Sequence, residues 1–261
     1  MSNSYFSKSL EKGLRVLSLF NREQPALTQT EIAHKLGLNM TSTYRYISTL
    51  VDMGFLEKDA ITKQIRPSIY CLAFCNNLMH ATDHRKIIKV LVDEIHSRFN
   101  ITIDVALSVD DDMMRIYNRQ ASDMMTFNLP DFTRNCLHNT ALGKAYLSTL
   151  PLDELKNRVK KLRLTSKTAQ TVVNRKALLE ELKQAKEQNF AINCEEYLPG
   201  LIAIAAPIVD LHKNKGIGAV SFDFSTIQRG VEEVKEQFAP IIIDLAKKIS
   251  YTIPTDYRNF N

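Results

Sequence analysis

Two short helices joined through a single glycine are the most restrictive pattern in this 261-residue chain. Thr28 and Glu31 have the spacing of a capping box, in which the hydroxyl accepts from the third helical N–H and the carboxylate reaches back. Gly37 ends this helix because glycine adopts a positive φ without steric cost. A second helix is predicted over residues 39–53, and Gly54 stops it. The pattern favours a helix-turn-helix unit.

Further elements flank this unit. Apolar side chains at three- and four-residue spacing predict a helix over residues 7–21. These side chains are Phe6, Leu10, Leu14, Leu17 and Phe20. Beyond Gly54, residues 55–58 and 64–67 are predicted to form two short strands around a polar turn. Three helices followed by a hairpin is the order of a winged helix-turn-helix module, which we assign to residues 1–70.

A helical connector is predicted to follow this module. Residues 68–79 and 83–99 both carry apolar side chains at helical spacing, and the connector is assigned to residues 71–99. This segment has no stretch rich in glycine, serine or proline. A rigid joint between the two halves of the chain is therefore expected.

The hydrophobic period changes after Asn100. Strands are predicted over residues 101–109, 113–119, 124–129, 190–194, 201–209 and 216–224. Helices are predicted over residues 140–149, 152–162 and 174–189, with a closing helix that Pro240 kinks or starts. Strands and helices mix without strict alternation. This indicates an α+β domain with a mainly antiparallel sheet over residues 100–261.

Composition and charge narrow the class of protein. The apolar fraction of 44% and the charged fraction of 24% exclude global disorder. No apolar run approaches the roughly 18–20 residues of a membrane span. The N-terminus lacks the apolar core of a secretion signal, and four scattered cysteines fit a reducing cytoplasm. Residues 1–80 hold nine basic and six acidic side chains, a basic excess that suits a phosphate-binding surface.

The helix over residues 39–53 carries the candidate DNA contacts. Opposite its inner residues Ile47, Leu50 and Val51, its outer face carries hydroxyls around the guanidinium of Arg45. Hydroxyls suit phosphate oxygens, and an arginine contacts a phosphate or bridges O6 and N7 of guanine. Either Tyr44 or Thr43 supplies a further inner position. The candidate contacts are Thr28, Gln29, Thr41, Ser42, Thr43, Tyr44, Arg45 and, on the wing, Lys58, Lys63 and Arg66. The alternative is a polar face that only contacts solvent.

The sequence resembles the IclR-type bacterial transcriptional regulators. In the first half, the matching segments are residues 9–17, 27–33, 36–38, 41–50 (TSTYRYISTL) and 54–56. In the second half, they are residues 137–145 (LHNTALGKA), 193–200 (NCEEYLPG) and 204–207 (IAAP). Three positions depart from the family pattern. Met40 stands where a polar or basic residue is usual, Asn193 replaces an aspartate, and Ala203 replaces a frequent cysteine.

This resemblance implies a GAF-like domain that binds a small-molecule effector. Its pocket residues would be Ala141, Leu142, Asn193, Ala203, Ser221 and Asp223, and Met124 and Phe127 would belong to an apolar lid. From the residues themselves, the N-terminus of the 140–149 helix suits a carboxylate. Asp223 would repel one unless it is turned away or protonated, which favours a ligand with a hydroxyl or amine beside any acid group. The alternatives are sheet packing for Ser221 and Ala203, core packing for the methionines and a solvated Asp223.

Catalytic and metal-binding motifs are absent from the sequence. It contains no Gly-rich phosphate loop, GxSxG, HExxH or CxxC, so no catalytic residue, cofactor or metal is expected. Cys71 and Cys75, at helical i, i+4 spacing, offer only two ligands. Glu195 and Glu196 do not suggest a catalytic pair, because adjacent strand residues face opposite sides of a sheet. One structural and one exposed glutamate are expected.

The sequence therefore predicts a cytoplasmic regulator whose affinity for a double-stranded DNA operator responds to a small metabolite. A homodimer or a dimer of dimers is expected, with the first helix and the connector helices as contacts, because one helix-turn-helix buries little DNA surface. No membrane partner is expected. One alternative is an enzyme domain fused to a winged-helix interaction module. Another is a winged-helix scaffold for RNA or protein without a ligand.

Overall fold

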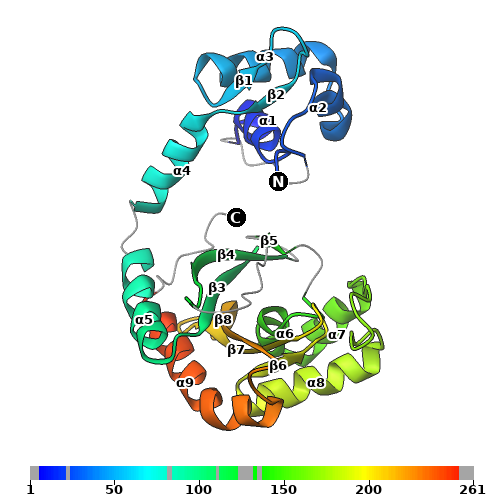
Figure 1. Cartoon of the computed structure of the whole chain (residues 1–261). Coiled ribbons are helices and arrows are strands. Elements are labelled where there is room, and N and C mark those ends of the chain that lie inside the picture. The colour runs from blue at the N-terminus through cyan, green and yellow to red at the C-terminus, as the bar shows by residue number, and fades with distance from the viewer. Residues whose placement is uncertain are drawn as a thin grey trace. The chain divides into compact units, whose positions relative to one another are not determined.

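The computed structural model describes residues 6–21, 24–80, 84–109, 112–122, 132–133 and 137–252. The chain divides into two compact units, Met1–Thr82 and Asp83–Asn261. The predicted connector is shared between them, because its first helix belongs to the first unit and its second helix to the second. The N-terminal unit runs from blue to cyan in Figure 1.

The first unit has the predicted order of elements. They are α1 (Lys8–Leu17), α2 (Gln29–Leu36), α3 (Met40–Asp52), β1 (Leu56–Lys58), β2 (Ile65–Pro67) and α4 (Ile69–His80). The capping box of α2 is confirmed: the N–H of Glu31 donates to the Thr28 hydroxyl, and the N–H of Thr28 donates to the Glu31 carboxylate at 2.7 Å. Gly37 caps α2 with φ +63°. Asn39 caps α3 by accepting from the N–H of Ser42 at 2.8 Å.

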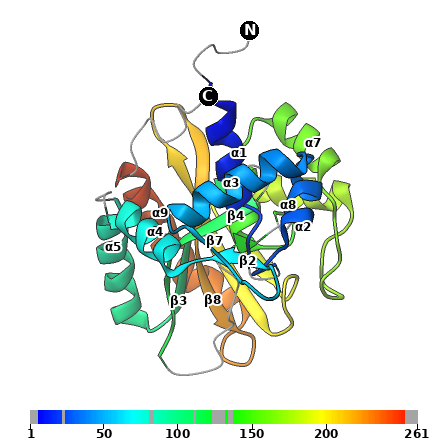
Figure 2. The same cartoon turned by 90° about the horizontal axis from the view of Figure 1, so that it is seen from above.

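Both α1 and α2 pack on α3 (Figures 1 and 2). The small core between them and the hairpin contains Val16, Leu27, Ile32, Ile47, Leu50, Leu56 and Ile65. Leu27 forms a β-bridge with Ile65 and so joins the start of α2 to the antiparallel wing. The inner position that the sequence left open is taken by Thr43, which is fully buried, whereas Tyr44 is 54% exposed.

The apolar stripe of α1 is largely exposed. Val16 is the buried residue of this helix, while Phe6, Leu10 and Leu14 are each more than half exposed. The apolar residues predicted to make α4 amphipathic are exposed as well, with Ile69 at 76% and Leu72 at 66%. The hydrophobic periodicity thus predicted both helices correctly, but most of their apolar area is not used inside the first unit.

The second unit is built on one six-stranded sheet in which every pair of neighbours is antiparallel, in the order β5-β4-β3-β8-β7-β6. Its strands are β3 (Thr102–Val109), β4 (Asp112–Arg119), β5 (Phe132–Thr133), β6 (Ala191–Cys194), β7 (Leu201–Asp210) and β8 (Lys215–Ser225). Its helices are α5 (His84–Phe99), α6 (Ala141–Ser148), α7 (Leu152–Lys161), α8 (Arg175–Gln188) and α9 (Val231–Thr252). The predicted α+β class with an antiparallel sheet is confirmed.

Each face of this sheet packs on helices (Figure 1). Val220, Phe222 and Phe224 of β8 belong to the core that α5 and α9 cover. The alternate residues of β8 face α6, where Ala219 belongs to the second core, because side chains alternate along a strand. Pro240 lies inside α9 and does not start it.

Gly143 fixes the position of α6. A Cβ at this position would lie 2.4 Å from the Cα of Leu137, so the helix approaches the preceding segment at backbone distance. Only glycine permits that approach. The first turn of α6 is thereby held against the α6-facing side of the sheet, beside β7 and β8.

Candidate nucleic-acid interface and ligand pocket

The outer face of α3 is solvent-exposed as predicted. Thr41 and Arg45 are exposed, and Ser42 and Ser48 are half-buried. In the part of the chain that the structure describes, the guanidinium of Arg45 has no hydrogen bond or ion pair. A helix of thirteen residues is about 20 Å long, which suits the major groove.

Thr43 does not belong to this surface. Its side chain is fully buried, and its hydroxyl donates to the carbonyl of Asn39 at 2.9 Å. Its place among the candidate DNA contacts was therefore wrong, because it lies on the face that packs on the core. Tyr44 takes the exposed position instead, with Lys58 of β1 above its ring at 6.0 Å from the centroid.

The remaining candidates make contacts within the first unit. The Thr28 hydroxyl serves the cap of α2, and Gln29 donates through Nε2 to the carbonyl of Met40 at 3.3 Å. On the wing, Lys63 donates to the carbonyl of Ala60 at 2.6 Å, and Arg66 pairs with Glu57 at 3.1 Å. Both partners of this last pair are well exposed, so it is weak enough to be exchanged for a phosphate.

A cavity opens beside the N-terminus of α6. It is lined by Thr140, Ala141, Leu142, Asn193, Tyr197, Leu201, Ala203, Ser221 and Asp223. The structure therefore brings together all six described residues that were predicted to form the pocket, although they span more than eighty positions of the sequence. Met124 and Phe127, the predicted lid residues, lie outside the described residues. The cavity encloses about 30 Å³, within about 380 Å³ of empty space that includes its open mouth.

The first turn of α6 offers hydrogen-bond donors to this cavity. Thr140 caps the helix by accepting from the N–H of Gly143 at 3.1 Å. The N–H groups of Ala141 and Leu142 precede the first intrahelical bond and have no acceptor inside the helix. A carboxylate or carbonyl oxygen is the group that such a helix start favours.

Asn193 acts mainly as a framework residue. Its Nδ2 donates to the carbonyl of Asn139 at 2.6 Å, and its Oδ1 accepts from the N–H of Glu196 at 3.3 Å. The side chain is 1% exposed. It therefore joins the segment before α6 to the turn after β6, and its amide is less adaptable toward a ligand than its residue type suggests.

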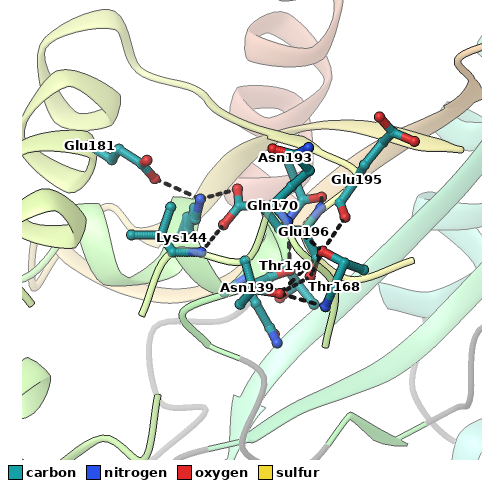
Figure 3. A network of polar contacts seen from close by, with 12 residues as sticks. Asn139, Thr140, Lys144, Thr168, Gln170, Glu181, Asn193, Glu195 and Glu196 are labelled. Atoms are coloured by element: carbon teal, nitrogen blue, oxygen red, sulfur yellow. Dashed lines mark hydrogen bonds and ion pairs between the residues drawn. The ribbon is translucent and has the colours of Figure 1, made fainter. Parts of the chain in front are cut away.

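A buried ammonium anchors the wall of the cavity (Figure 3). Lys144 of α6 is 2% exposed, and its Nζ contacts Glu196 and, at 2.7 Å, Glu181 of α8. Burial raises the pKa of Glu196, and the charge of Lys144 opposes that rise. Because Lys144 belongs to α6 and Glu196 to the turn that carries Tyr197, this ion pair holds two walls of the cavity together.

Two threonines complete this network (Figure 3). The hydroxyls of Thr168 and Thr171 donate to the carbonyls of Glu195 and Glu196, each at 2.7 Å; Thr168 is labelled in the figure. Both glutamates lie in the turn after β6 and not on a strand, so the expectation of one structural and one exposed glutamate was wrong. Glu196 binds Lys144, and Glu195 accepts from the N–H of Gly200 at 2.7 Å. Both are structural.

Four residues of this site were not predicted from the sequence: Lys144, Thr168, Thr171 and Tyr197. The sequence did contain an indication for Lys144, because a lysine among the small and apolar residues of a predicted buried helix needs a buried counter-charge. The two threonines lie in the segment between α7 and α8, where no local pattern marks a residue that will contact a turn more than twenty positions away.

Neither a metal cluster nor a membrane span is found in the described part of the chain. No group of three or more His, Cys, Asp or Glu side chains there is arranged to hold a metal ion. None of its helices combines the length and apolar character needed to cross a bilayer.

Comparison with known proteins settles the family. Residues 76–251 match the model of the C-terminal domain of the bacterial transcriptional regulator IclR, and residues 9–60 match the IclR helix-turn-helix domain. The chain belongs to the IclR family. Like the family's other members, this regulator combines a helix-turn-helix DNA-binding domain with a C-terminal effector-binding domain.

The relatives cover nearly the whole IclR-family chain. The regulator KipR of Bacillus subtilis is 23% identical over 94% of this chain and 98% of its own length. An IclR regulator from Alicyclobacillus acidocaldarius has a TM-score of 0.79 at 20% identity, over 95% of this chain and 99% of its own. An IclR homologue from Microbacterium hydrocarbonoxydans, solved with 4-hydroxybenzoate, has a TM-score of 0.72 at 19% identity, over 94% and 98%.

Proposed function

We propose that this IclR-family regulator reads its operator with the outer face of α3 and that the cavity beside α6 is its effector site. The exposed guanidinium of Arg45, without a partner among the described residues and surrounded by short hydroxyls, is the observation that supports the first assignment most strongly. Arginine in this position is suited to bidentate contact with guanine or to a phosphate. Lys58 and Arg66 are assigned to the DNA backbone beside the wing.

We further propose that the functional unit is a homodimer, which pairs again as a dimer of dimers. The exposed apolar side chains of α1 and α4 support this, because monomeric proteins rarely expose a large contiguous apolar surface. Pairing through this surface would present two copies of α3 to the two half-sites of an operator.

The regulation we propose is a shift between two populations of the regulator. An effector bound beside α6 stabilises one arrangement of the cavity wall, and the two arrangements differ in how they space the copies of α3. A coupling free energy of about 1–3 kcal/mol would change operator affinity roughly 5- to 150-fold. The site of action is the cytoplasm, where chromosomal DNA is bound.

We propose no enzymatic role for the cavity. A nucleophilic hydroxyl needs an adjacent base that is oriented by a third group. In the described lining, Ser221 stands beside the carboxylate of Asp223, and no histidine lies among the lining residues. A binding site explains these groups more simply than an active site does.

The test of the DNA-reading surface is Arg45→Ala. Operator fragments are first selected from random DNA with the wild-type protein, and affinities are then measured by gel shift and footprinting. We expect a loss of about 1–3 kcal/mol in specific binding, with an unchanged circular dichroism spectrum. Lys156→Ala on α7, an exposed cation of the second unit, is the matched control. A wild-type footprint with Arg45→Ala would remove α3 from the interface.

A further inference from the structure

The carboxylate of Asp223 lines the cavity, and one of its two oxygens is not satisfied by the residues that the structure describes. The side chain lines the cavity and is 8% exposed. Its Oδ2 is buried and has no hydrogen-bond partner among the residues that the structure describes. A buried acceptor left in this state destabilises the folded protein. A buried acceptor without a partner calls for an explanation in a folded protein. One explanation is that a bound ligand supplies the hydrogen-bond donor.

The nearby cation Arg115 is shared with a second buried carboxylate. On the same face of the sheet, Thr102 is paired with Asp223 and Asp104 with Ser221, so the two aspartates are diagonal neighbours. Asp104 is 2% exposed and accepts from Arg115 at 3.2 Å. Two buried carboxylates therefore share one guanidinium, and that guanidinium is hydrogen-bonded to Asp104. Burial, followed by the charge of Asp104, raises the pKa of Asp223 well above its usual range.

Another part of the cavity lining offers hydrogen-bond donors. The N–H groups of Ala141 and Leu142 at the start of α6 are donors, whereas Asp223, on the wall formed by β8, is an acceptor. No Lys or Arg is among the described lining residues. The cavity is small, with about 30 Å³ inside and about 380 Å³ of empty space when its open mouth is included. A ligand with few non-hydrogen atoms is the one that can touch both walls.

We propose that the effector is a small bifunctional molecule that donates a hydrogen bond to Asp223 through a hydroxyl or protonated amine while an oxygen acceptor of the same molecule lies at the N-terminus of α6. Hydroxy acids and amino acids have this chemistry, and simple carboxylic acids do not. The inference rests on the proposed function, in which this cavity is the effector site. A site built to hydrogen-bond a ligand group rejects the analogue that lacks it, because the buried partner is then left unpaired.

The test uses three matched probes, lactate, alanine and propanoate, which share a three-carbon acid and differ in the donor at C2. Their binding to the full chain is measured by isothermal titration calorimetry and thermal shift. We expect lactate or alanine to bind with a Kd below about 10 mM and at least about tenfold more tightly than propanoate. The comparison of lactate with alanine shows whether the donor is a hydroxyl or an ammonium.

Asp223→Asn should remove this discrimination. The amide is nearly isosteric, carries no charge and still fills the same space, so propanoate should approach the affinity of the donor probe to within about threefold. Asp210→Asn is the matched control, because Asp210 has the same exposure of 8% and is not among the lining residues. It should leave the ratio of affinities unchanged.

Three results would overturn the inference: equal binding of propanoate and the donor probes to the wild type, the same ratio of affinities in Asp223→Asn, or no binding of either donor probe. A further variant, Ala203→Leu, fills the cavity from β7. It distinguishes a wrong ligand class from a wrong assignment of the effector site. If probes bind Ala203→Leu as well as the wild type, the cavity itself is not the site. If Ala203→Leu abolishes binding of all probes but Asp223→Asn leaves the ratio of donor-probe to propanoate affinity unchanged, the cavity is the effector site and only the proposed ligand class is wrong.

Discussion

One residue, Asp223, lowers the stability of this protein although the fold does not require an acid at its position. Asp223 is a buried acid on a sheet face where Ala203 and Ala219 show that small apolar side chains are accommodated. Functional sites commonly retain such groups at the expense of stability. Thr43 is the opposite case, a hydroxyl placed in a core because it can donate to the carbonyl one turn earlier and so bury no unpaired donor.

Asp223→Asn should stabilise the protein at neutral pH. Since the folded state raises the pKa of Asp223 above the usual 3.8, the native state binds more protons than the unfolded state above pH 3.8, and stability falls as pH rises through the folded pKa. Removing the ionisable group removes that loss, which we expect to amount to about 1–3 kcal/mol. Urea denaturation at several pH values checks this. A gain that grows toward acid pH would contradict the assignment.

At the scale of elements, buried polar contacts hold the helices and turns around the cavity. Lys144 joins α6 to α8 and to the turn after β6, while Thr168 and Thr171 join the α7–α8 segment to that same turn. Apolar packing places α6 on the sheet, but it is non-directional. These directional contacts determine where Tyr197 and the start of α6 stand.

Lys144→Met should be strongly destabilising, by about 3–5 kcal/mol, because it leaves Glu196 buried without a counter-charge. The double variant Lys144→Met/Glu196→Gln should recover part of this loss, since it removes both charges. Thermal denaturation of the two single variants and the double variant gives the coupling free energy. Additive losses would show that the two side chains act independently. Glu181→Gln, with its partly exposed carboxylate, should have a much smaller effect.

At the scale of the whole molecule, two compact units carry the two halves of the function. The first unit buries only a small core, and its α1 and α4 leave large apolar side chains in solvent. The second unit has two cores, one on each face of its sheet. The exposed apolar side chains of α1 and α4 form the surface that we assign to the proposed partner copy.

Leu14→Asp should convert the proposed dimer into a monomer without unfolding it, because Leu14 is 57% exposed and contributes little to the core of its own chain. Light scattering coupled to size exclusion measures the mass, and circular dichroism measures the helix content. We expect operator affinity to fall at least about tenfold when one half-site is lost. Leu152→Asp on α7, at 60% exposure, is the control. A dimer that persists in Leu14→Asp would exclude this surface.

Local interactions explain why so much of the architecture is predictable. Capping by Thr28 and Asn39, the positive φ of Gly37, and hydrophobic periods of helix and strand all act within a few residues, so the sequence alone determined the elements, their order and the family. The pocket residues were predicted through the family resemblance, and the geometry brings them together from α6, β6, β7 and β8.

Only the tertiary structure decided which faces are buried and which polar groups meet. Sequence periodicity shows that Leu10 and Leu14 share a helix face, but not whether that face meets the chain's own core. Nor does it show that Lys144 pairs with Glu196, 52 positions away, or that Oδ2 of Asp223 has no donor among the described residues. Burial and long-range pairing depend on the packing of the complete chain, because apolar area and counter-charges are supplied by segments that no local pattern connects.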